Sequence, residues 1–132
     1  MAEGIPVNLL LDTCALIALA NGPLPPAFAQ AFGLATQAFI PPVSAWEVTI
    51  KYKAGKLRLP KLPLTWFRSL CELYHLTELP LDTSIFCAAA DLPLIHCDPF
   101  DRVLIATAQT HQLTLITSDQ IIPTYPGVLT LW

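Results

Sequence analysis

The chain has 132 residues and a net charge of −3, and 54 % of its residues are hydrophobic while 13 % are charged. This length fits one domain, residues 1–132, and excludes a second. The acidic balance excludes sequence-independent adhesion to nucleic acid over a broad surface, although it leaves a local basic patch open. Such an apolar chain also predicts that a partner covers part of its surface, so we expect an oligomer or a protein complex.

The span between Thr13 and Trp46 contains no charged residue, which raises the question of a membrane segment. Prolines divide this span into pieces far shorter than the ~20 apolar residues that a spanning helix needs. The first six residues lead directly into a strand, and they lack the basic region and long apolar core of a signal peptide. We therefore expect a cytoplasmic protein that does not contact a membrane.

The first half of the chain predicts short strands separated by helices. Strands are expected over residues 7–11 and 38–40, and helices over residues 13–20, 27–34 and 44–54. The first strand is a continuous apolar run, typical of a buried parallel strand, and Asp12 follows its carboxyl end. Ser44 is a candidate N-cap because Glu47 follows it at the spacing of a capping box.

The second half continues this alternation, with helices expected over residues 64–74 and 83–90 and from Pro99, and strands over residues 76–81, 113–117 and 128–132. Apolar side chains at helical spacing in the first of these helices are expected in the core: Trp66, Phe67, Leu70, Leu73 and Tyr74. Strands that alternate with helices predict an α/β domain with a mainly parallel sheet and right-handed crossovers.

Residues 98–101 have the pattern of a helix start, with Asp98 as N-cap, Pro99 at the first helical position and Asp101 in the first turn. One cap already satisfies the helix end, so a second acid beside it adds repulsion unless a cation lies there. We therefore assign Asp98 mainly to helix capping and Asp101 to a functional site. Asp82 is also interpreted as a helix cap.

Four acids are expected to meet at one edge of the sheet, because the carboxyl ends of parallel strands share that edge. Asp12 and Asp119 follow strands, Glu47 and Asp101 lie in first turns of helices, and capping does not explain the two strand-end acids. Clustered carboxylates without basic partners raise one another's pKa and cost stability, which favours a hard divalent cation, Mg²⁺ or Mn²⁺. Such ions support phosphodiester hydrolysis, whereas the chain has no Gly-rich phosphate loop and no serine-nucleophile elbow.

Two further groups of residues bear on ligands. Basic side chains are concentrated between residues 51 and 61, and they form either a phosphate track for RNA or a solvated helix face: Lys51, Lys53, Lys56, Arg58 and Lys61. The cysteines have no Cys-x-x-Cys spacing and are interpreted as small buried hydrophobes: Cys14, Cys71, Cys87 and Cys97. His96 and Cys97 are adjacent and chelate one ion poorly, so zinc is not favoured.

The chain resembles the PIN-domain ribonucleases, and within them the VapC-type toxins of bacterial toxin–antitoxin pairs. The resemblance covers nearly the whole length and rests on four segments: Leu10-Leu11-Asp12-Thr13, Ser44-Ala45-Trp46-Glu47-Val48, Asp98-Pro99-Phe100-Asp101-Arg102 and Leu115-Ile116-Thr117-Ser118-Asp119. Each segment alone is weak evidence, whereas four in this order are specific. The resemblance implies a PIN-like domain, a three-layer α/β/α sandwich with a parallel sheet of four or five strands.

The same resemblance implies a metal-dependent endoribonuclease that a small VapB-like antitoxin neutralises, and it implies a homodimer. Its metal-binding acids would be Asp12, Glu47, Asp101 and Asp119, with Asp98 as an additional acid near the pocket. Cys14 and Cys97 stand where relatives often carry histidine or a basic residue, which affects the surroundings of the site and removes no metal ligand.

Two other functions are compatible with the sequence. One is a PIN-like module that has lost catalysis and only binds partners, but the presence of all four acids favours the enzyme. The other is a Mg²⁺-dependent phosphatase or DNA-directed nuclease outside a toxin–antitoxin pair, which needs the same acids.

Overall fold

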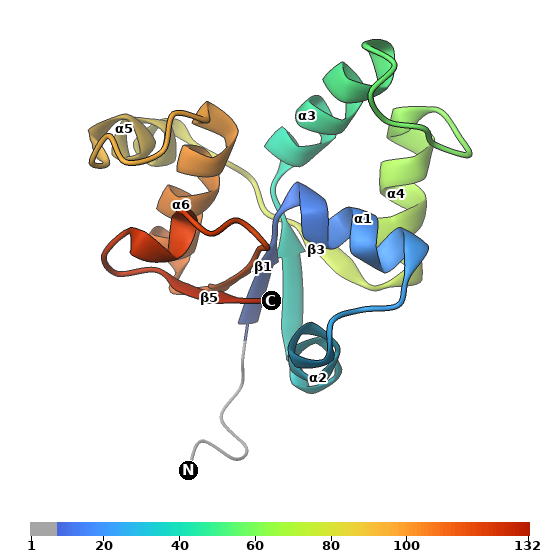
Figure 1. The fold of residues 1–132 in the computed structure, drawn as a ribbon, viewed down its shortest axis with the longest axis horizontal. Coiled ribbons are helices and arrows are strands. Elements are labelled where there is room, and N and C mark those ends of the chain that lie inside the picture. Colours follow the sequence, from blue (N-terminus) through green and yellow to red (C-terminus); the bar gives the residue numbers. More distant parts are fainter. Residues whose placement is uncertain (1–7) are drawn as a thin grey trace.

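The computed structural model describes residues 8–132. Val7 of the first expected strand and the six residues that argue against a signal peptide lie outside the described residues. The strands are β1 (Asn8–Leu11), β2 (Gln37–Ile40), β3 (Leu76–Glu78), β4 (Thr114–Ile116) and β5 (Leu129–Leu131). The helices, drawn in Figure 1, are α1 (Thr13–Asn21), α2 (Pro26–Leu34), α3 (Pro42–Lys53), α4 (Pro63–Leu73), α5 (Thr83–Asp91), α6 (Pro99–His111) and the short 3₁₀ helix η1 (Ile122–Thr124).

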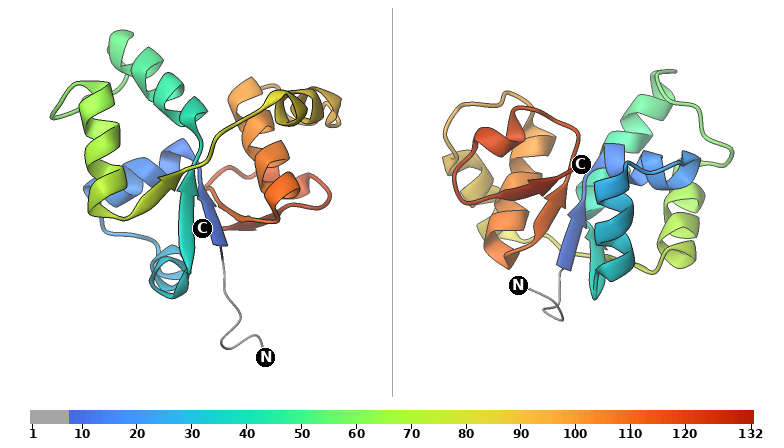
Figure 2. Two further views of the ribbon diagram at one scale, coloured as in Figure 1. Left: turned by 180° about the vertical axis from the view of Figure 1, so that it is seen from behind. Right: turned by 60° about the horizontal axis from the view of Figure 1, so that its bottom comes forward.

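The strands form one sheet in the order β3-β2-β1-β4-β5, and every neighbouring pair is parallel. The predicted α/β architecture with a parallel sheet is therefore confirmed. From β1 the chain moves outward through β2 to β3 and then crosses back to β4, on the other side of β1 (Figures 1 and 2). The strand order thus reverses between β1 and β4, and ligands of open α/β sheets bind outside the carboxyl ends of strands at such a reversal.

Two cores hold this sheet between helices. Leu9 and Leu11 of β1 face a core that also contains buried side chains of α1, α2 and α4. Leu10, which points to the opposite face, packs with Leu104 and Ile105 of α6. This alternation follows from the twofold repeat of side chains along a strand. The helices and the sheet therefore form the three layers that the resemblance implied.

Helix α4 shows where the predicted core ends. Trp66, Phe67 and Leu70 are buried, as expected. Leu73 is 66 % exposed, so its assignment to the core is wrong, because it is the last residue of the helix and lies beyond the packed face. Tyr74 is half-buried, and its hydroxyl donates a hydrogen bond to the carbonyl oxygen of Leu19 at 2.9 Å.

Helix caps confirm two predictions and correct one. An Oδ1 atom of Asp98 accepts from the backbone N–H of Phe100 at 2.9 Å, and Asp82 caps α5 in the same way. The capping box at Ser44 is wrong, because α3 already begins at Pro42, a residue suited to the first helical position. Glu47 consequently lies in the second turn of α3 rather than the first.

Strand β3 is shorter than the expected strand 76–81. The ladder continues only to the backbone N–H of Leu79, which donates to the carbonyl oxygen of Ile40 at 2.9 Å. Pro80 has no N–H group and ends the pairing there.

Arg102 fixes the loop that joins α5 to α6. It is 8 % exposed, and its guanidinium donates to the carbonyl oxygens of Ala89, Leu92 and Pro93, each at 2.9 Å. The loop over residues 92–98 is therefore tied to a buried side chain of α6 before it reaches the first residue of that helix.

All four cysteines are free thiols. Cys71 is half-buried, but Cys14, Cys87 and Cys97 are exposed, so the expectation of buried cysteines is wrong for these three. Within residues 8–132, no helix is both long and apolar enough to cross a membrane.

Candidate active site

A cavity of about 180 Å³ opens at the carboxyl edge of the sheet, where β1 and β4 end. The structure brings together at this cavity all five acids that the sequence singled out: Asp12, Glu47, Asp98, Asp101 and Asp119. The other lining residues are Thr13, Cys14, Lys51 and Ser118. Asp12 follows β1, Glu47 lies on α3, Asp98 and Asp101 lie at the start of α6, and Asp119 follows β4. The fold, rather than one local motif, therefore assembles the cluster.

Asp12 is 5 % exposed, and its Oδ1 atom accepts a hydrogen bond from the backbone N–H of Ala15 at 2.7 Å. It is therefore also the N-cap of α1, and the expectation that capping does not involve Asp12 is wrong. Burial, reinforced by the charges of Glu47 and Asp119, raises the pKa of Asp12 to about 6, against hydrogen bonds that lower it. The ionised form thus lacks sufficient solvation within the protein alone.

Glu47 is held between two side chains. Thr13 donates its hydroxyl to Oε1 of Glu47 at 2.5 Å, and the ammonium of Lys51, one turn along α3, lies 3.2 Å from Oε2. The expectation of an acid cluster without basic partners is therefore wrong at this position. Lys51 also lines the cavity, and its side chain is 45 % exposed, so it can contact a ligand that enters from solvent.

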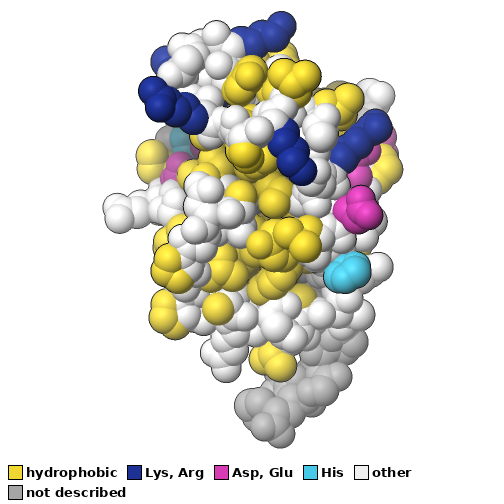
Figure 3. All heavy atoms as spheres, turned by 90° about the vertical axis from the view of Figure 1, so that its right-hand side faces the viewer, with side chains coloured by type: hydrophobic (Ala, Val, Ile, Leu, Met, Phe, Trp, Pro, Cys, Tyr) yellow, Lys and Arg dark blue, Asp and Glu magenta, His cyan; other side chains and the backbone are white. Residues whose placement is uncertain are grey.

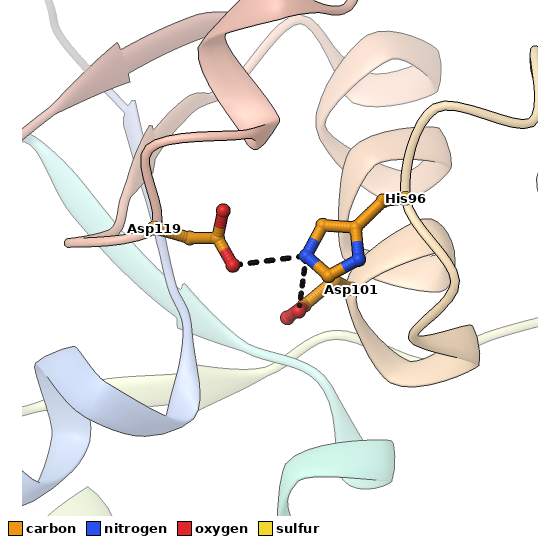
Figure 4. A group of neighbouring side chains, drawn as sticks. All are labelled: His96, Asp101 and Asp119. Atoms are coloured by element: carbon orange, nitrogen blue, oxygen red, sulfur yellow. Dashed lines mark hydrogen bonds and ion pairs between the residues drawn. The ribbon is translucent and has the colours of Figure 1, made fainter.

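His96 contacts two further acids, Asp101 and Asp119, as Figure 4 shows. Its Nε2 atom hydrogen-bonds to Oδ2 of Asp119 at 2.9 Å and lies 3.0 Å from Oδ2 of Asp101. Sequence reasoning considered His96 only as a zinc partner of Cys97 and missed this arrangement. The available signal was its position two residues before Asp98, in the segment that leads into α6.

Asp101 and Asp119 have opposite pKa shifts. Burial and the charge of Asp98 raise the pKa of Asp101 to about 7, although His96 opposes the shift. Burial also disfavours ionised Asp119, but hydrogen bonds from His96 and from the backbone N–H groups of Ile121 and Ile122 outweigh it and lower the pKa of Asp119. Asp119 thereby also holds the turn into η1, a local role that the sequence did not reveal.

The pKa of His96 itself is raised. Burial, the largest effect, lowers it, but the hydrogen bond with Asp119 and the charges of Asp101, Asp119 and Asp98 together outweigh burial.

The donor set fits a hard divalent cation. Carboxylate oxygens are the ligands that Mg²⁺ and Mn²⁺ prefer in proteins. Carboxylate oxygens of Asp101 and Asp119 lie within 4.8 Å of each other. Burial is the largest cause of the raised pKa values of Asp12 and Asp101, so the ionised forms of these two carboxylates are poorly solvated within the protein alone. A cation at the cavity would stabilise these ionised forms.

The remaining basic side chains lie outside the cavity. Lys53, at the end of α3, and the following Lys56, Arg58 and Lys61 are exposed. Figure 3 views the molecule from the side on which α4 lies and shows Lys and Arg side chains toward one end, with apolar side chains across the middle. The predicted basic patch is thus solvent-exposed and reaches the cavity only through Lys51.

Without added metal, the chain should become more stable as the pH falls from 8 to 5. Asp12 and Asp101 have folded-state pKa values of about 6 and about 7, above their ordinary value of 3.8. A carboxyl whose pKa is raised by folding binds a proton preferentially in the folded state, so the free energy of unfolding rises as the pH falls through the folded pKa. We expect a gain of about 2–4 kcal/mol.

Urea denaturation in EDTA at pH 8 and pH 5 measures this gain. The Asp101→Asn variant is the matched control, because it lacks the group with the higher folded-state pKa and should gain less. A wild-type chain that loses stability over this pH interval would contradict the electrostatic description of the site.

Comparisons with known proteins bear on the fold and the family of the chain. Ribonuclease VapC22 of Mycobacterium tuberculosis is 28 % identical over 109 residues, which are 80 % of this chain and 82 % of that protein. A chain of a toxin–antitoxin complex from Klebsiella pneumoniae is 25 % identical, with a TM-score of 0.65 over 92 % of this chain and 96 % of that chain. A chain of DNA-bound VapBC from Salmonella typhimurium shares the fold, with a TM-score of 0.70 at 20 % identity over 95 % of this chain and 97 % of that chain. The PIN domain family matches residues 9–127, and the chain belongs to that family.

Proposed function

We propose that the chain is a metal-dependent endoribonuclease that cleaves RNA phosphodiester bonds in the cytoplasm, as the toxin of a toxin–antitoxin pair. The observation that carries this proposal is the meeting of five acids at one cavity, at the reversal of strand order. Membership of the PIN domain family and the similarity to ribonuclease VapC22 support RNA cleavage as the activity. Intact acids favour the enzyme over a PIN-like module that only binds partners.

Asp12, Glu47, Asp101 and Asp119 would hold Mg²⁺ or Mn²⁺. Such an ion would supply Lewis acidity toward phosphate oxygens and lower the pKa of the attacking water. The chain's own groups prepare the site: the N–H of Ala15 fixes Asp12, and Thr13 fixes Glu47. Asp98, whose Oδ1 is occupied by the helix cap, has the secondary role of adding negative charge beside Asp101.

Lys51, Lys53, Lys56 and Arg58 would contact the RNA backbone. Their exposure and the position of Lys51 at the cavity support a cationic path that leads to the acids. Lysine and arginine side chains bind phosphates through charge, with no requirement for a base sequence. This path would give RNA affinity and leave the choice of cleavage site to other features.

The proposed partners are a VapB-like antitoxin and a second copy of the chain. The antitoxin follows from the toxin–antitoxin complexes of proteins with this fold. The dimer is supported by a hollow of about 460 Å³ lined only by apolar side chains, among them Trp46, Ile50 and Phe86. Val43 and Trp46 of the uncharged span 13–46 line this hollow. Most other exposed large apolar side chains lie after that span. Light scattering over a range of concentrations tests the dimer.

Cleavage of RNA by the purified chain tests the function. We expect cleavage of RNA that is single-stranded, or that has both single- and double-stranded parts, with Mg²⁺ or Mn²⁺ and no cleavage in EDTA. Hydrolysis of DNA or of a phosphomonoester in place of RNA would favour the nuclease or phosphatase outside a toxin–antitoxin pair. Absence of all three activities with metal bound would favour the inactive binding module.

A further inference from the structure

We propose that His96 is a positioning residue that holds Asp101 and Asp119 together from outside the cavity and does not itself bind the metal ion. The inference rests on the proposed metal site, and it assigns a role to a residue beyond the four acids. It predicts that His96 controls how tightly the chain binds Mg²⁺ or Mn²⁺ through hydrogen bonding alone.

His96 contacts two of the acids but lies beside the cavity. Five acids line the cavity, whereas His96 does not belong to its lining in the described part of the chain. Its Nε2 atom nevertheless lies 2.9 Å from Asp119 and 3.0 Å from Asp101. His96 therefore contacts these two carboxylates from beside the residues that line the cavity, although by distance alone it is close enough to both acids to be a ligand.

A hydrogen bond at Nδ1 of His96 determines which ring nitrogen carries the hydrogen. The backbone N–H of Asp98 donates to Nδ1 of His96 at 3.1 Å, so Nδ1 presents a lone pair and the ring hydrogen is on Nε2. Nε2 thus donates to Oδ2 of Asp119, and Oδ2 of Asp101 lies 3.0 Å from the same nitrogen. A metal ligand needs a lone pair at that atom, so Nε2 cannot coordinate an ion in this arrangement.

Buried side chains fix the backbone of the loop at His96. The backbone N–H of His96 donates to the hydroxyl of Tyr125 at 2.6 Å, and Tyr125 is only 2 % exposed. Arg102 lies 3.4 Å from the same hydroxyl and holds the carbonyl oxygen of Pro93, three residues before His96. The loop therefore presents His96 to the acids in a defined position.

His96 bridges two acids that come from separate elements of the fold. Asp101 lies on α6 and Asp119 follows β4, so two separate elements must bring these like charges together. Within residues 8–132, the His96 side chain is the one group that forms ion-pair or hydrogen-bond contacts with both carboxylates. Outer groups of this kind orient metal ligands, and their loss costs about 10–100-fold in metal affinity.

Calorimetric titration with Mn²⁺ tests the inference on the full-length chain. His96→Ala should weaken Mn²⁺ binding about 10–100-fold. His96→Gln should restore most of the affinity, because glutamine can place an N–H donor near the position of Nε2. His111→Ala, at the exposed end of α6, is the matched histidine control and should bind Mn²⁺ as the wild type does. Melting curves in EDTA check that each variant is folded.

Other results would contradict the role of His96 or the metal site itself. Equal loss of affinity in the alanine and glutamine variants would make His96 a ligand, and tighter binding by His96→Ala would make it a competitor of the ion. Unchanged binding by His96→Ala would remove its positioning role while leaving the proposed function intact. A wild-type chain that binds no Mn²⁺ would overturn the metal site and this inference together.

Nitrogen-15 NMR of the Mg²⁺-loaded chain gives an independent readout. The ring hydrogen should stay on Nε2 of His96 when Mg²⁺ is added. Loss of that hydrogen on Mg²⁺ binding would overturn the inference, because it is the signature of a histidine that coordinates the ion.

Discussion

Asp101→Asn is expected to lower RNA cleavage by about a thousandfold, because stabilisation of charge by a metal site is worth several kcal/mol and about 1.4 kcal/mol corresponds to a factor of ten. The variant keeps the size of the side chain and its place beside His96. It removes a carboxylate whose pKa is raised to about 7 by burial and by Asp98, so the metal-free fold should be at least as stable as the wild type. Initial rates of cleavage with Mn²⁺, together with melting curves in EDTA, measure both effects.

Asp98→Asn is the matched control for this prediction. Asparagine is a good N-cap and can still accept from the N–H of Phe100, so α6 should begin at the same residue. Cleavage should fall less than in Asp101→Asn, because Asp98 adds charge near the metal ligands and is not assigned as one. Equal losses in the two variants would contradict this division of roles.

Arg102→Met is expected to lower the free energy of unfolding by about 3–5 kcal/mol, because several carbonyl oxygens that are at least partly buried lose their donor, at ~1–3 kcal/mol each. The carbonyls belong to Ala89, Leu92 and Pro93, and methionine fills the space of the arginine stem without replacing any hydrogen bond. Urea denaturation measures the loss. The loop that carries His96 should also loosen, so Mn²⁺ affinity should fall with stability.

Arg68→Met is the control for Arg102→Met. Arg68 is exposed on α4, and loss of a surface arginine should change stability by no more than about 0.5 kcal/mol. Arg102→Lys keeps the charge but supplies fewer donors in a different geometry, so it should fall between wild type and Arg102→Met. If the free energy of unfolding of Arg102→Met lies within about 1 kcal/mol of the wild-type value, these hydrogen bonds contribute little.

The sequence predicted the parts of the site that depend on topology. An apolar run before Asp12, and a segment of strong β character before Asp119, predict parallel strands. The shared edge of such strands brings the two acids together. The same reasoning placed Asp101 at the cavity, because Asp98 and Pro99 define where α6 starts. These inferences needed only the order of elements along the chain.

The sequence could not predict contacts that depend on side-chain geometry. His96 meets Asp119 across 23 positions of sequence, and no local pattern marks such a pair. The capping box at Ser44 was wrong because prolines at 41 and 42 start α3 earlier than a serine cap would. The capping role of Asp12 was missed because α1 begins immediately after β1, with no residue between the strand and the cap.

The central claim is that Asp12, Glu47, Asp101 and Asp119 form a divalent metal site. Thermal melts of the wild type and of Asp12→Asn, each in EDTA and in Mn²⁺, test it most directly. Mn²⁺ at a hundredfold excess over its Kd should stabilise the wild type by about 2.7 kcal/mol. Asp12→Asn should be at least as stable in EDTA, because asparagine can still cap α1 without the buried charge, and its gain from Mn²⁺ should be much smaller. An Asp12→Asn chain that is destabilised in EDTA and keeps the full Mn²⁺ response would contradict the claim and make Asp12 a structural acid.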